Sequence, residues 1–496
     1  MLERAILAGH NIGFDTQFLV SAGFPWASVD SCWDTMLAAI VLDGVGPAKG
    51  RHTLQALAER FLGVNLPKEQ QRSDWSGELS QEQLEYAARD AAVLLPLLDA
   101  IEAALRRDSL MDIVNLEFRC LPAMAWMEHT GLLIDREAWT ELAKQQKAEA
   151  DRLRSELDAT TSKPVNWNSP KQVLAWLRDL DVEVPSTDVA ALLEHAEGHP
   201  PIRTLLEWRK ASKLVSTYGM AFIHHAHPAT GRIHPDWRQI GARTGRMSCS
   251  NPNLQNLPRR EEYRQCIVPS PGCAFIVADY SQIELRVVAA LSGDRRLLEA
   301  YRDGVDVHCQ TASMVLGVAE AEITKADRQL AKVLNFSLLY GCGVQKLQET
   351  LFVNHGIVVS LKRARELHRG FFDVYKGLRA WERRVIESQE PEVRLESGRL
   401  IREVERGPQQ ANYRVQGLAG DGLKHALALL WETRDTCPSA RLVAAVHDEL
   451  LVEVAEDEAE RAREWVERCM LEGMRRVVSG VEIEVEAKVC KSWAGK

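Results

Sequence analysis

"CAFIVADYSQIELRVVAALSGD", residues 273–294, joins a strand-like apolar run to two acidic residues. Residues 275–278 are apolar and predict a short buried strand. Asp279 follows this run directly, and Glu284 comes just over one helical turn later. Apolar residues then recur at helical spacing, at Ile283, Val287, Ala290 and Leu291. The stretch therefore predicts a strand that delivers a carboxylate at a strand-to-helix junction.

A second acid of this kind lies in "RLVAAVHDELLVEV", residues 441–454. Two β-like runs flank His447, Asp448 and Glu449, which is typical of a hairpin with these residues at its turn. Neighbouring hairpin residues face opposite ways, so one of the two acids should be the stronger ligand. An acid at a single strand end is usually a turn former or an N-cap. Two on apolar strands instead predict a pair of oxygen ligands for Mg²⁺, with two ions about 4 Å apart.

The segment "TKADRQLAKVLNFSLLYG", residues 324–341, predicts a helix that Thr324 caps together with Asp327. Two cations and two aromatic residues recur along it at intervals of four, namely Arg328, Lys332, Phe336 and Tyr340. Each step of four advances only about 40° around the axis, so the four side chains form one slowly winding stripe. The cations lie near the positive N-terminal end of the helix. This pattern predicts a nucleoside triphosphate along the helix, with phosphates on the cations and the base on the aromatic rings.

Composition limits the class of protein. A chain of 496 residues is long enough for three or four units, and 26% of its residues are charged. No apolar run approaches the roughly 18 residues that a membrane span needs, and Glu3 and Arg4 follow Met1, which argues against a secretory signal. The ten cysteines form no CxxC pair or zinc-type cluster, so we expect reduced thiols. We expect a cytoplasmic protein without a membrane partner.

The charge distribution is uneven. The formal net charge is −9, but residues 201–260 contain ten Lys and Arg against two Asp and Glu, a local net charge of +8. A solvated face is one interpretation of such a run. Because the cations alternate with Trp237, Gly241, Gly245 and amide residues, contact with a phosphate backbone is the other.

Four long motifs, in order along the chain, resemble those of family A DNA polymerases, the bacterial DNA polymerase I type and its phage relatives. The segment "TGRMSCSNPNLQNLPRR" (244–260) is similar to the primer-template segment, and "DYSQIELR" (279–286) to motif A. "RQLAKVLNFSLLYG" (328–341) resembles motif B, and "VHDELLVEV" (446–454) resembles motif C. The resemblance covers nearly the whole length.

The resemblance implies roles for individual residues. Asp279 and Asp448 become the catalytic ligands of two Mg²⁺ ions, with Mn²⁺ as a substitute, and Glu449 becomes a weaker partner near the primer terminus. Glu284 resembles the steric gate that fills the space of a ribose 2′-hydroxyl. With His308 added, the stripe of Arg328, Lys332, Phe336 and Tyr340 binds the deoxynucleoside triphosphate, and Phe at 336 is associated with rejection of dideoxynucleotides. The implied DNA contacts are Arg246, Arg260, Asn412, Gln416, Arg209, Lys213 and His447.

The fold implied is a multidomain α/β protein with a right-hand polymerase of palm, fingers and thumb behind a truncated ribonuclease H-like exonuclease domain. We predict the exonuclease-like domain in residues 1–105 and the thumb in 106–235. The first palm segment covers 236–290, the fingers 291–404 and the second palm segment 405–496. The expected partners are primer-template DNA and deoxynucleoside triphosphates, and the protein is expected to act as a monomer. The resemblance names no processivity factor, and places the protein in the bacterial nucleoid or a phage-infected cell.

The first hundred residues resemble the 3′-to-5′ proofreading domain of the same family. "HNIGFD" supplies Asp15, and "YAARD" supplies Tyr86 and Asp90 on one helical face. That domain also needs an Asp-x-Glu pair on an earlier strand, and the chain begins too late to contain it. We therefore predict weak or absent proofreading, with Asp15, Tyr86 and Asp90 as a vestigial site.

Two other functions fit parts of the sequence. A single-subunit RNA polymerase or primase-like enzyme would share the palm, but Glu284 and the intact "DYSQIELR" oppose it. A non-catalytic DNA-binding replication factor would suit the incomplete exonuclease. The presence of every expected metal and triphosphate residue opposes that function. Template-directed DNA synthesis is the main hypothesis.

Overall fold

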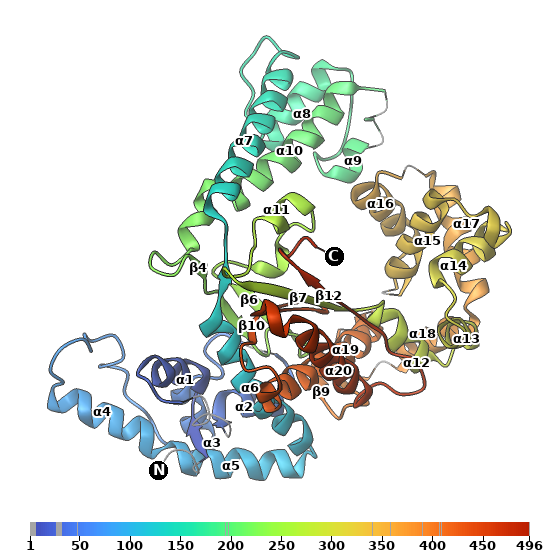
Figure 1. Ribbon diagram of the computed structural model, residues 1–496. Coiled ribbons are helices and arrows are strands. Elements are labelled where there is room, and N and C mark those ends of the chain that lie inside the picture. The colour runs from blue at the N-terminus through green and yellow to red at the C-terminus, as the bar shows by residue number, and fades with distance from the viewer. Residues whose placement is uncertain are drawn as a thin grey trace.

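The computed structural model describes residues 6–25, 32–46, 48–193, 195–196, 198–339, 341–357, 359–388, 390–405, 407 and 409–495. Its centre is a four-stranded antiparallel sheet with strand order β10-β11-β7-β12 (Figure 1). The strands are β7 (Cys273–Tyr280), β10 (Arg441–Val446), β11 (Glu449–Ala455) and β12 (Val485–Cys490). The sheet therefore joins a strand of the first predicted palm segment to strands of the second, although the end of β7 and the start of β10 lie 161 residues apart in sequence.

Three helices back this sheet. They are α6 (Met111–Thr130), α19 (Gln409–Glu432) and α20 (Ala459–Arg475). α20 packs on β7 and β12 and along α19, and α6 packs on β10 and along α19. Gly473 permits the close approach of α19 and α20, because a Cβ there would lie 2.4 Å from the backbone nitrogen of Ala426. The predicted thumb began at residue 106, but the packing places α6 beneath the sheet instead.

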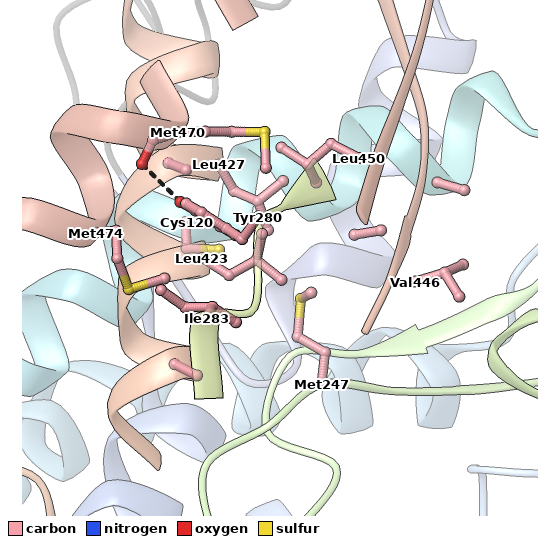
Figure 2. Close-up of a cluster of buried hydrophobic side chains, with 14 of the residues drawn as sticks. Cys120, Met247, Tyr280, Ile283, Leu423, Leu427, Val446, Leu450, Met470 and Met474 are labelled. Carbon is pink, nitrogen blue, oxygen red and sulfur yellow. Dashed lines mark hydrogen bonds between the residues drawn. The ribbon is translucent and has the colours of Figure 1, made fainter. Parts of the chain in front are cut away.

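The core between the sheet and these helices is apolar and continuous (Figure 2). Tyr280, at the end of β7, is buried in it and donates a hydrogen bond of 2.6 Å to the carbonyl oxygen of Met470 in α20. Figure 2 shows this tyrosine in one cluster with Cys120 of α6, Leu423 and Leu427 of α19, Leu450 of β11 and Met474 of α20. The end of β7 is thus held by both packing and a buried hydrogen bond.

A buried charge cluster ties α6 and α19 to a hairpin. The hairpin consists of β8 (Glu392–Arg394) and β9 (Leu400–Arg402), and Arg399 lies just before β9. Its guanidinium contacts Glu117 at 2.5 Å and Asp421 at 2.6 Å, and the Lys424 ammonium contacts Glu117 at 2.6 Å. All four side chains are nearly inaccessible to solvent. Two cations and two anions therefore neutralise each other where three elements meet.

A helical projection rises above the sheet (Figure 1). It contains α7 (Arg136–Asp158), α8 (Pro170–Asp179), α9 (Val189–Leu193) and α10 (Pro200–Tyr218). Its outer part has a separate hydrophobic core that includes Trp167, Trp176 and Trp208. Short elements connect its base to the sheet, namely β3 (Leu132–Leu133), β4 (Arg232–Ile233), β5 (Asp236–Arg238), β6 (Ser248–Ser250) and α11 (Glu261–Gln265).

A second group of helices stands on the other side of the sheet (Figure 1). It runs from α12 (Ile283–Ser292) through α13 (Arg295–Arg302), α14 (Val307–Leu316), α15 (Lys325–Leu338), α16 (Val344–His355) and α17 (Leu361–Val374) to α18 (Lys376–Ser388). α17 packs against α14, α15 and α16, whereas α18 packs against α12 and α19. The two groups of helices stand on either side of the sheet (Figure 1), which is the arrangement of a right hand.

The N-terminal domain lies below the sheet (Figure 1). Only β1 (Leu7–Gly9) and β2 (Cys32–Asp34) pair in its described part, as a two-stranded parallel sheet. Its helices are α1 (Ile12–Ser21), α2 (Thr35–Asp43), α3 (Leu54–Leu62), α4 (Gln81–Ala92) and α5 (Leu94–Arg107). The predicted α/β class of this domain is confirmed.

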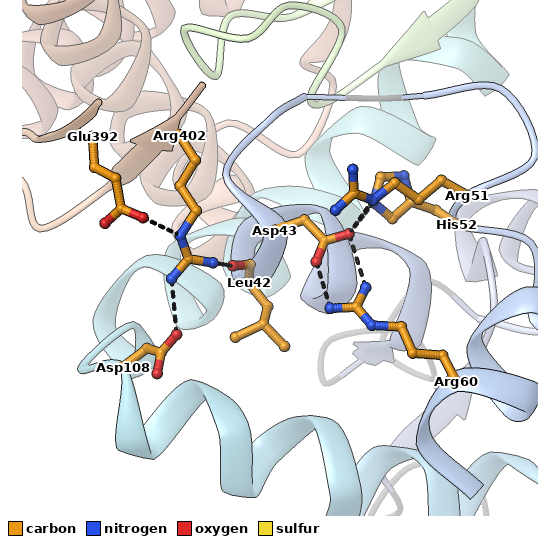
Figure 3. Close-up of polar contacts among 8 residues, drawn as sticks. All are labelled: Leu42, Asp43, Arg51, His52, Arg60, Asp108, Glu392 and Arg402. Carbon is orange, nitrogen blue, oxygen red and sulfur yellow. Dashed lines mark hydrogen bonds and ion pairs between the residues drawn. The ribbon is translucent and has the colours of Figure 1, made fainter. Parts of the chain in front are cut away.

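Polar contacts join this domain to the rest of the chain (Figure 3). Arg402 of β9 donates to the carbonyl oxygen of Leu42 at 2.7 Å and pairs with Asp108 at 3.0 Å. Nearby, Asp43 at the end of α2 pairs with Arg60 at 2.8 Å and lies 2.9 Å from His52. Burial alone would raise the pKa of Asp43, but the hydrogen bonds from His52 and Arg60 outweigh it and hold that pKa well below its usual range.

Two further sequence predictions concern the whole chain. None of the helices in the described ranges is long and apolar enough to cross a membrane. All ten cysteines are free thiols, as the absence of paired cysteine motifs predicts.

Candidate active site

Asp279 and Asp448 lie side by side at one edge of the central sheet. Asp279 is the penultimate residue of β7 and stands opposite Glu449, the first residue of β11. His447 and Asp448 form the two-residue turn between β10 and β11, and His447 takes a left-handed backbone conformation with φ of 59°. The backbone nitrogen of Tyr280 donates to the carbonyl oxygen of Asp448 at 3.3 Å. The strand and the hairpin thus bring together two acids 169 residues apart.

The position of Asp279 follows from its neighbours. The predicted strand ended at Ala278, but β7 continues through Tyr280 because β12 pairs with its last residues. Since the Tyr280 side chain is fixed in the core (Figure 2), the strand cannot shift by one residue without moving that ring to the other face. The core therefore fixes the direction in which Asp279 leaves the sheet.

The two carboxylates repel each other. Burial raises the pKa of Asp448 well above its usual range, and the neighbouring Asp279 charge raises it further. A divalent cation would relieve both effects, so this donor pair fits a hard cation such as Mg²⁺. In the described ranges, no three His, Cys, Asp or Glu side chains lie close enough together to hold a metal alone. An ion here would take its remaining ligands from water and substrate phosphates, as Mg²⁺ commonly does.

Glu449 lies beside this pair but has partners of its own. Its carboxylate accepts hydrogen bonds from the indole nitrogen of Trp493 and from Arg264 at 3.2 Å. The Arg264 guanidinium also stacks 4.7 Å from the Trp493 ring centroid. Glu449 and Trp493 are both buried. The expectation that only one of the two hairpin acids faces the site directly agrees with this arrangement, and a metal-binding role for Glu449 stays a prediction.

The sequence did not point to Arg264 and Trp493. Three residues follow Trp493 in the sequence, and its backbone nitrogen donates to the carbonyl oxygen of Ile267 at 3.0 Å. An isolated tryptophan near a chain end has no motif that would reveal this contact. Its "KSW" context contains no signal beyond an apolar residue after two polar ones.

We predict that Trp493→Phe slows nucleotide addition about 10-fold, because a buried charged acceptor that loses its donor costs about 1–3 kcal/mol. The phenyl ring is smaller than the indole and donates no hydrogen bond to Glu449, so the thermal midpoint should fall as well. The Michaelis constant for the nucleotide should stay constant, since the residues of α15 are untouched. Primer extension at several nucleotide concentrations measures the rate and the Michaelis constant. Trp75→Phe, at an exposed position, is the matched control. An unchanged rate would show that the indole nitrogen does not position the hairpin.

Glu284 lies in the first turn of α12 and forms an ion pair with Arg246. Both side chains are partly buried. Burial lowers the pKa of His447, and the nearby cations Arg259 and Arg246 lower it further. The structure thus brings the predicted sugar filter, one predicted DNA contact and the predicted metal ligands into one region.

The helix with the cation and aromatic stripe is α15, and Thr324 and Asp327 form the predicted capping box. Lys332 is exposed, whereas Arg328 is half-buried and pairs with Asp306 at 2.8 Å. Phe336 is half-buried farther along the same face. Tyr340, the fourth member of the stripe, lies outside the described residues.

His308 of α14 adjoins this stripe. Its ring centroid lies 5.9 Å from that of Phe336. Burial lowers the pKa of His308 to about 4, so the ring is neutral near pH 7. Its Nδ1 lies 2.8 Å from the amide nitrogen of Asn335, which only donates, so the ring proton is on Nε2. The ring can therefore donate one hydrogen bond to a substrate oxygen.

The basic stretch 201–260 does not act as one surface. Arg232 is buried and pairs with Glu453 at 2.6 Å, so it stabilises β11 and cannot contact DNA. The interpretation of this stretch as a phosphate-binding surface is wrong for that residue. Arg209 donates to the carbonyl oxygen of Thr187 at 2.5 Å, and Arg260 pairs with Glu262. Lys213 is exposed on the helical projection.

Asn412 and Gln416 lie near the start of α19, and both side chains are half-buried. The Oδ1 atom of Asn412 is buried without a hydrogen-bond partner among the described residues. A buried amide oxygen in this state is costly, which is consistent with a polar ligand at this point.

The predicted exonuclease residues line a large cavity of about 1300 Å³ between the N-terminal domain, α6 and β5. Tyr86 and Asp90 hydrogen-bond to each other, and burial raises the pKa of Asp15 and of Asp90. Asp34 also lines this cavity, and the sequence analysis missed it. Its carboxylate caps α2 and accepts hydrogen bonds from the backbone nitrogens of Asn11, Ile12, Met36 and Leu37, so it is already committed to the fold.

Comparisons with known proteins agree with this geometry. A family model described as DNA polymerase family A matches residues 136–495, and a model described as 3′-5′ exonuclease matches residues 1–106. DNA polymerase I of Aquifex aeolicus is 32% identical over 99% of this chain and 88% of its own length. DNA polymerase I of Pseudomonas aeruginosa is 31% identical over 99% of this chain, which spans 56% of that relative.

A solved structure is similar throughout. The POL domain of Pol1 from M. smegmatis, in complex with DNA primer-template and dNTP, superposes with a TM-score of 0.85 at 28% identity. The match covers 98% of this chain and 86% of that one. The right-hand fold with an N-terminal exonuclease domain is thereby confirmed. The chain belongs to DNA polymerase family A and is a template-directed DNA polymerase.

Proposed function

We propose that this chain adds deoxynucleotides to the 3′-hydroxyl of a DNA primer with two Mg²⁺ ions, which Asp279 and Asp448 would hold. One observation carries the proposal: two mutually repelling carboxylates on the ends of buried strands share one edge of the sheet. Ions bound there would activate the primer hydroxyl and neutralise charge on the leaving pyrophosphate. Mn²⁺ offers similar ligand chemistry.

The protein's own residues bind and orient the substrates. Lys332 and Arg328 supply positive charge for the triphosphate, and the neutral His308 donates from Nε2. Phe336 offers an aromatic face to the base or sugar. Arg328 must exchange its bond with Asp306 for a phosphate oxygen, so nucleotide binding would release Asp306. Such an exchange couples substrate binding to the contact between α14 and α15.

We keep the predicted domain boundaries with one change. We assign residues 1–105 to the exonuclease-like domain, 236–290 and 405–496 to the palm and 291–404 to the fingers. Of the predicted 106–235 thumb, we assign α6 to the palm because it packs on α19 and β10. Primer-template DNA would lie between the helical projections, with Arg246, Arg260, Asn412, Gln416 and His447 near the primer end and Arg209 and Lys213 on the projection.

Primer extension tests this proposal. The purified chain, a DNA primer-template and Mg²⁺ should extend the primer with deoxynucleotides, and removal of the metal with a chelator should stop extension. Dideoxynucleotides should be incorporated less well than deoxynucleotides, because Phe occupies position 336. Extension on ribonucleotides at an equal rate would favour the RNA polymerase alternative, and no extension would favour the non-catalytic factor.

We predict that Glu284→Ala weakens the rejection of ribonucleotides by about 10- to 100-fold, because truncation opens the space that the 2′-hydroxyl needs. Glu284→Gln keeps the size and removes the charge, so it should retain most of the discrimination. The measurement is the ratio of catalytic efficiencies for a matched ribonucleotide and deoxynucleotide. If both variants lose discrimination equally, the ion pair with Arg246, and not the bulk of the side chain, sets it.

We also propose that the chain excises mismatched primer ends weakly or not at all. Asp15 and Asp90 line one cavity, but Asp34 is committed to backbone bonds and no third acid completes a metal site in the described ranges. A labelled primer with a 3′ mismatch should therefore keep its length when nucleotides are absent. Removal of the mismatch that Asp15→Ala abolishes would contradict this prediction.

A further inference from the structure

Two consecutive helices of the fingers carry cations in the same spacing. α17 presents Lys362, Arg365 and Arg369, and α18 presents Lys376, Arg379 and Arg383, each set at positions i, i+3 and i+7. All six side chains are exposed. This spacing puts each set on one face of its helix, opposite the buried residues Leu367, Phe371, Trp381 and Val385. We call these six residues the α17–α18 stripe.

The two halves of the stripe meet at the corner between the helices. Only Tyr375 separates α17 from α18. Arg379 of α18 lies 3.4 Å from Asp373 in the last turn of α17. Burial lowers the pKa of His368, and the Arg379 charge lowers it further, which also places Arg379 beside the end of α17. The cations therefore continue from one helix to the next.

The stripe lacks the acidic partners that surface helices usually have. Residues 361–388 contain eight Lys and Arg against four Asp and Glu, in a chain with a net charge of −9. Within the described part of the chain, Arg379 alone of the six stripe residues has an ion pair. Burial raises the pKa of one of the four acids, Glu382, to about 7, which further reduces the negative charge present.

Another helix of this protein shows the contrast. Four of the five Lys and Arg residues of α7 pair with an acid three or four positions away, as in Lys147 with Asp151 at 2.7 Å and Arg152 with Glu149 at 2.6 Å. Such pairs neutralise a solvated helix. The unneutralised charge of the α17–α18 stripe instead suits a polyanion.

The chemistry of the stripe indicates which part of a nucleic acid it contacts. Three cations on one helix span about 10 Å, a distance over which a nucleic-acid strand offers several phosphates. The aromatic residues of these helices, Phe371, Phe372, Tyr375 and Trp381, are buried. No aromatic ring is therefore available for base stacking, and contacts to the backbone without sequence preference follow.

The position of the stripe indicates which strand it contacts. α17 packs against α14 and α15, which carry His308, Arg328 and Lys332, and α18 packs against α12 and α19. The stripe thus lies on helices that support the nucleotide site, in the group of helices that stands opposite the α7–α10 projection (Figure 1). The primer duplex is expected on the side of that projection. The strand that reaches the fingers is the template that has not yet been copied.

We propose that the α17–α18 stripe binds the phosphate backbone of the single-stranded template ahead of the primer terminus. This inference rests on the proposed DNA synthesis for the direction of the template. It adds a binding surface about which the catalytic residues give no information.

Binding measurements with two template lengths test the proposal. The probes are labelled primer-templates with a 5′ overhang of about 2 or about 20 nucleotides. The unmodified chain should bind the long overhang about 10-fold more tightly. The triple variant Lys362→Gln, Arg365→Gln, Arg369→Gln should lose most of that gain, and its salt dependence should fall by a log–log slope of about 2, since each single-strand phosphate contact contributes about 0.7. The matching triple variant of Lys376, Arg379 and Arg383 should lose the same part of the affinity gain and of the salt dependence.

The short overhang and a distant triple variant provide the controls. Arg461→Gln, Arg468→Gln and Arg475→Gln remove the same charge from exposed positions of α20 and should leave the overhang-dependent gain intact. Affinity and extension rate on the short overhang should stay unchanged in both stripe variants.

Four results would overturn the proposal. The first is an equal affinity of the unmodified chain for both overhangs, and the second is an equal loss in the α20 control. The third is a stripe variant that weakens binding to short and long overhangs alike, which would assign the surface to duplex DNA. The fourth is unchanged DNA binding with altered capture of an acidic protein, which would assign the surface to a protein partner. If the chain fails to extend primers while the overhang-dependent gain persists, the proposed synthesis fails and the surface stands.

Discussion

Replacement of Asp448 by Asn should reduce nucleotide addition by on the order of 10³-fold while the protein remains folded. A metal-held transition state gains several kcal/mol from its ions, and about 4 kcal/mol corresponds to this factor in rate. An amide is a poor substitute for a carboxylate as a Mg²⁺ ligand. The loss should appear in the rate of single-nucleotide addition under single-turnover conditions, with little change in primer-template affinity.

Stability should respond in the opposite direction. The pKa of Asp448 is raised in the fold by burial and by Asp279, so its ionised form is unfavourable in the folded protein. Neutralisation removes this cost, and the thermal midpoint of Asp448→Asn should equal or exceed that of the unmodified chain. Asp435→Asn, at an exposed position after α19, is the matched control and should keep full activity. Nucleotide addition by Asp448→Asn within about 10-fold of the unmodified chain would remove the basis for the two-metal proposal.

The largest effect on stability is expected from the buried charge cluster. Lys424→Met should lower the free energy of unfolding by about 3–5 kcal/mol, because it leaves Glu117 and Asp421 to share the single charge of Arg399 in the interior. The midpoint of urea denaturation, followed by tryptophan fluorescence, measures the loss. Limited proteolysis should then cut the β8–β9 hairpin sooner, since Arg399 ties that hairpin to α6 and α19.

The double variant Glu117→Leu, Lys424→Met provides the control. It removes one cation and one anion together, and Arg399 keeps its pair with Asp421 at 2.6 Å. Replacing a buried ion pair by apolar groups of similar volume is often neutral. The double variant should therefore be more stable than either single variant, and an additive loss would show that the charges do not compensate one another.

Local patterns predicted the parts of the site that lie on single elements. The apolar run before Asp279 forms β7, the two β-like runs around "HDE" form the β10–β11 hairpin, and the spacing of four in residues 328–336 forms one face of α15 with its capping box. In each case the predictive signal comes from residues close in sequence. The spacing of residues along one strand or helix sets the face on which each side chain lies, so the periodicity of the sequence predicts these faces directly.

Contacts between distant elements escaped the same analysis. Arg232 belongs to a basic stretch by sequence, yet it is buried and pairs with Glu453, 221 residues away. The indole of Trp493 meets Glu449 across the palm, and α6 packs beneath the sheet although the sequence placed it in the thumb. None of these residues lies in a pattern that distinguishes a solvated side chain from a paired one.

The sequence by itself determined the reaction class, because its motifs carry the acids, the cations and the helix that displays them. Only the tertiary structure decided that Asp279 and Asp448 share an edge, that Glu449 is held by Trp493 and Arg264, and which cations remain exposed. The reason is physical, because local backbone geometry sets which side chains share one face of a strand or helix. The charge and exposure of a side chain depend instead on which elements pack against it.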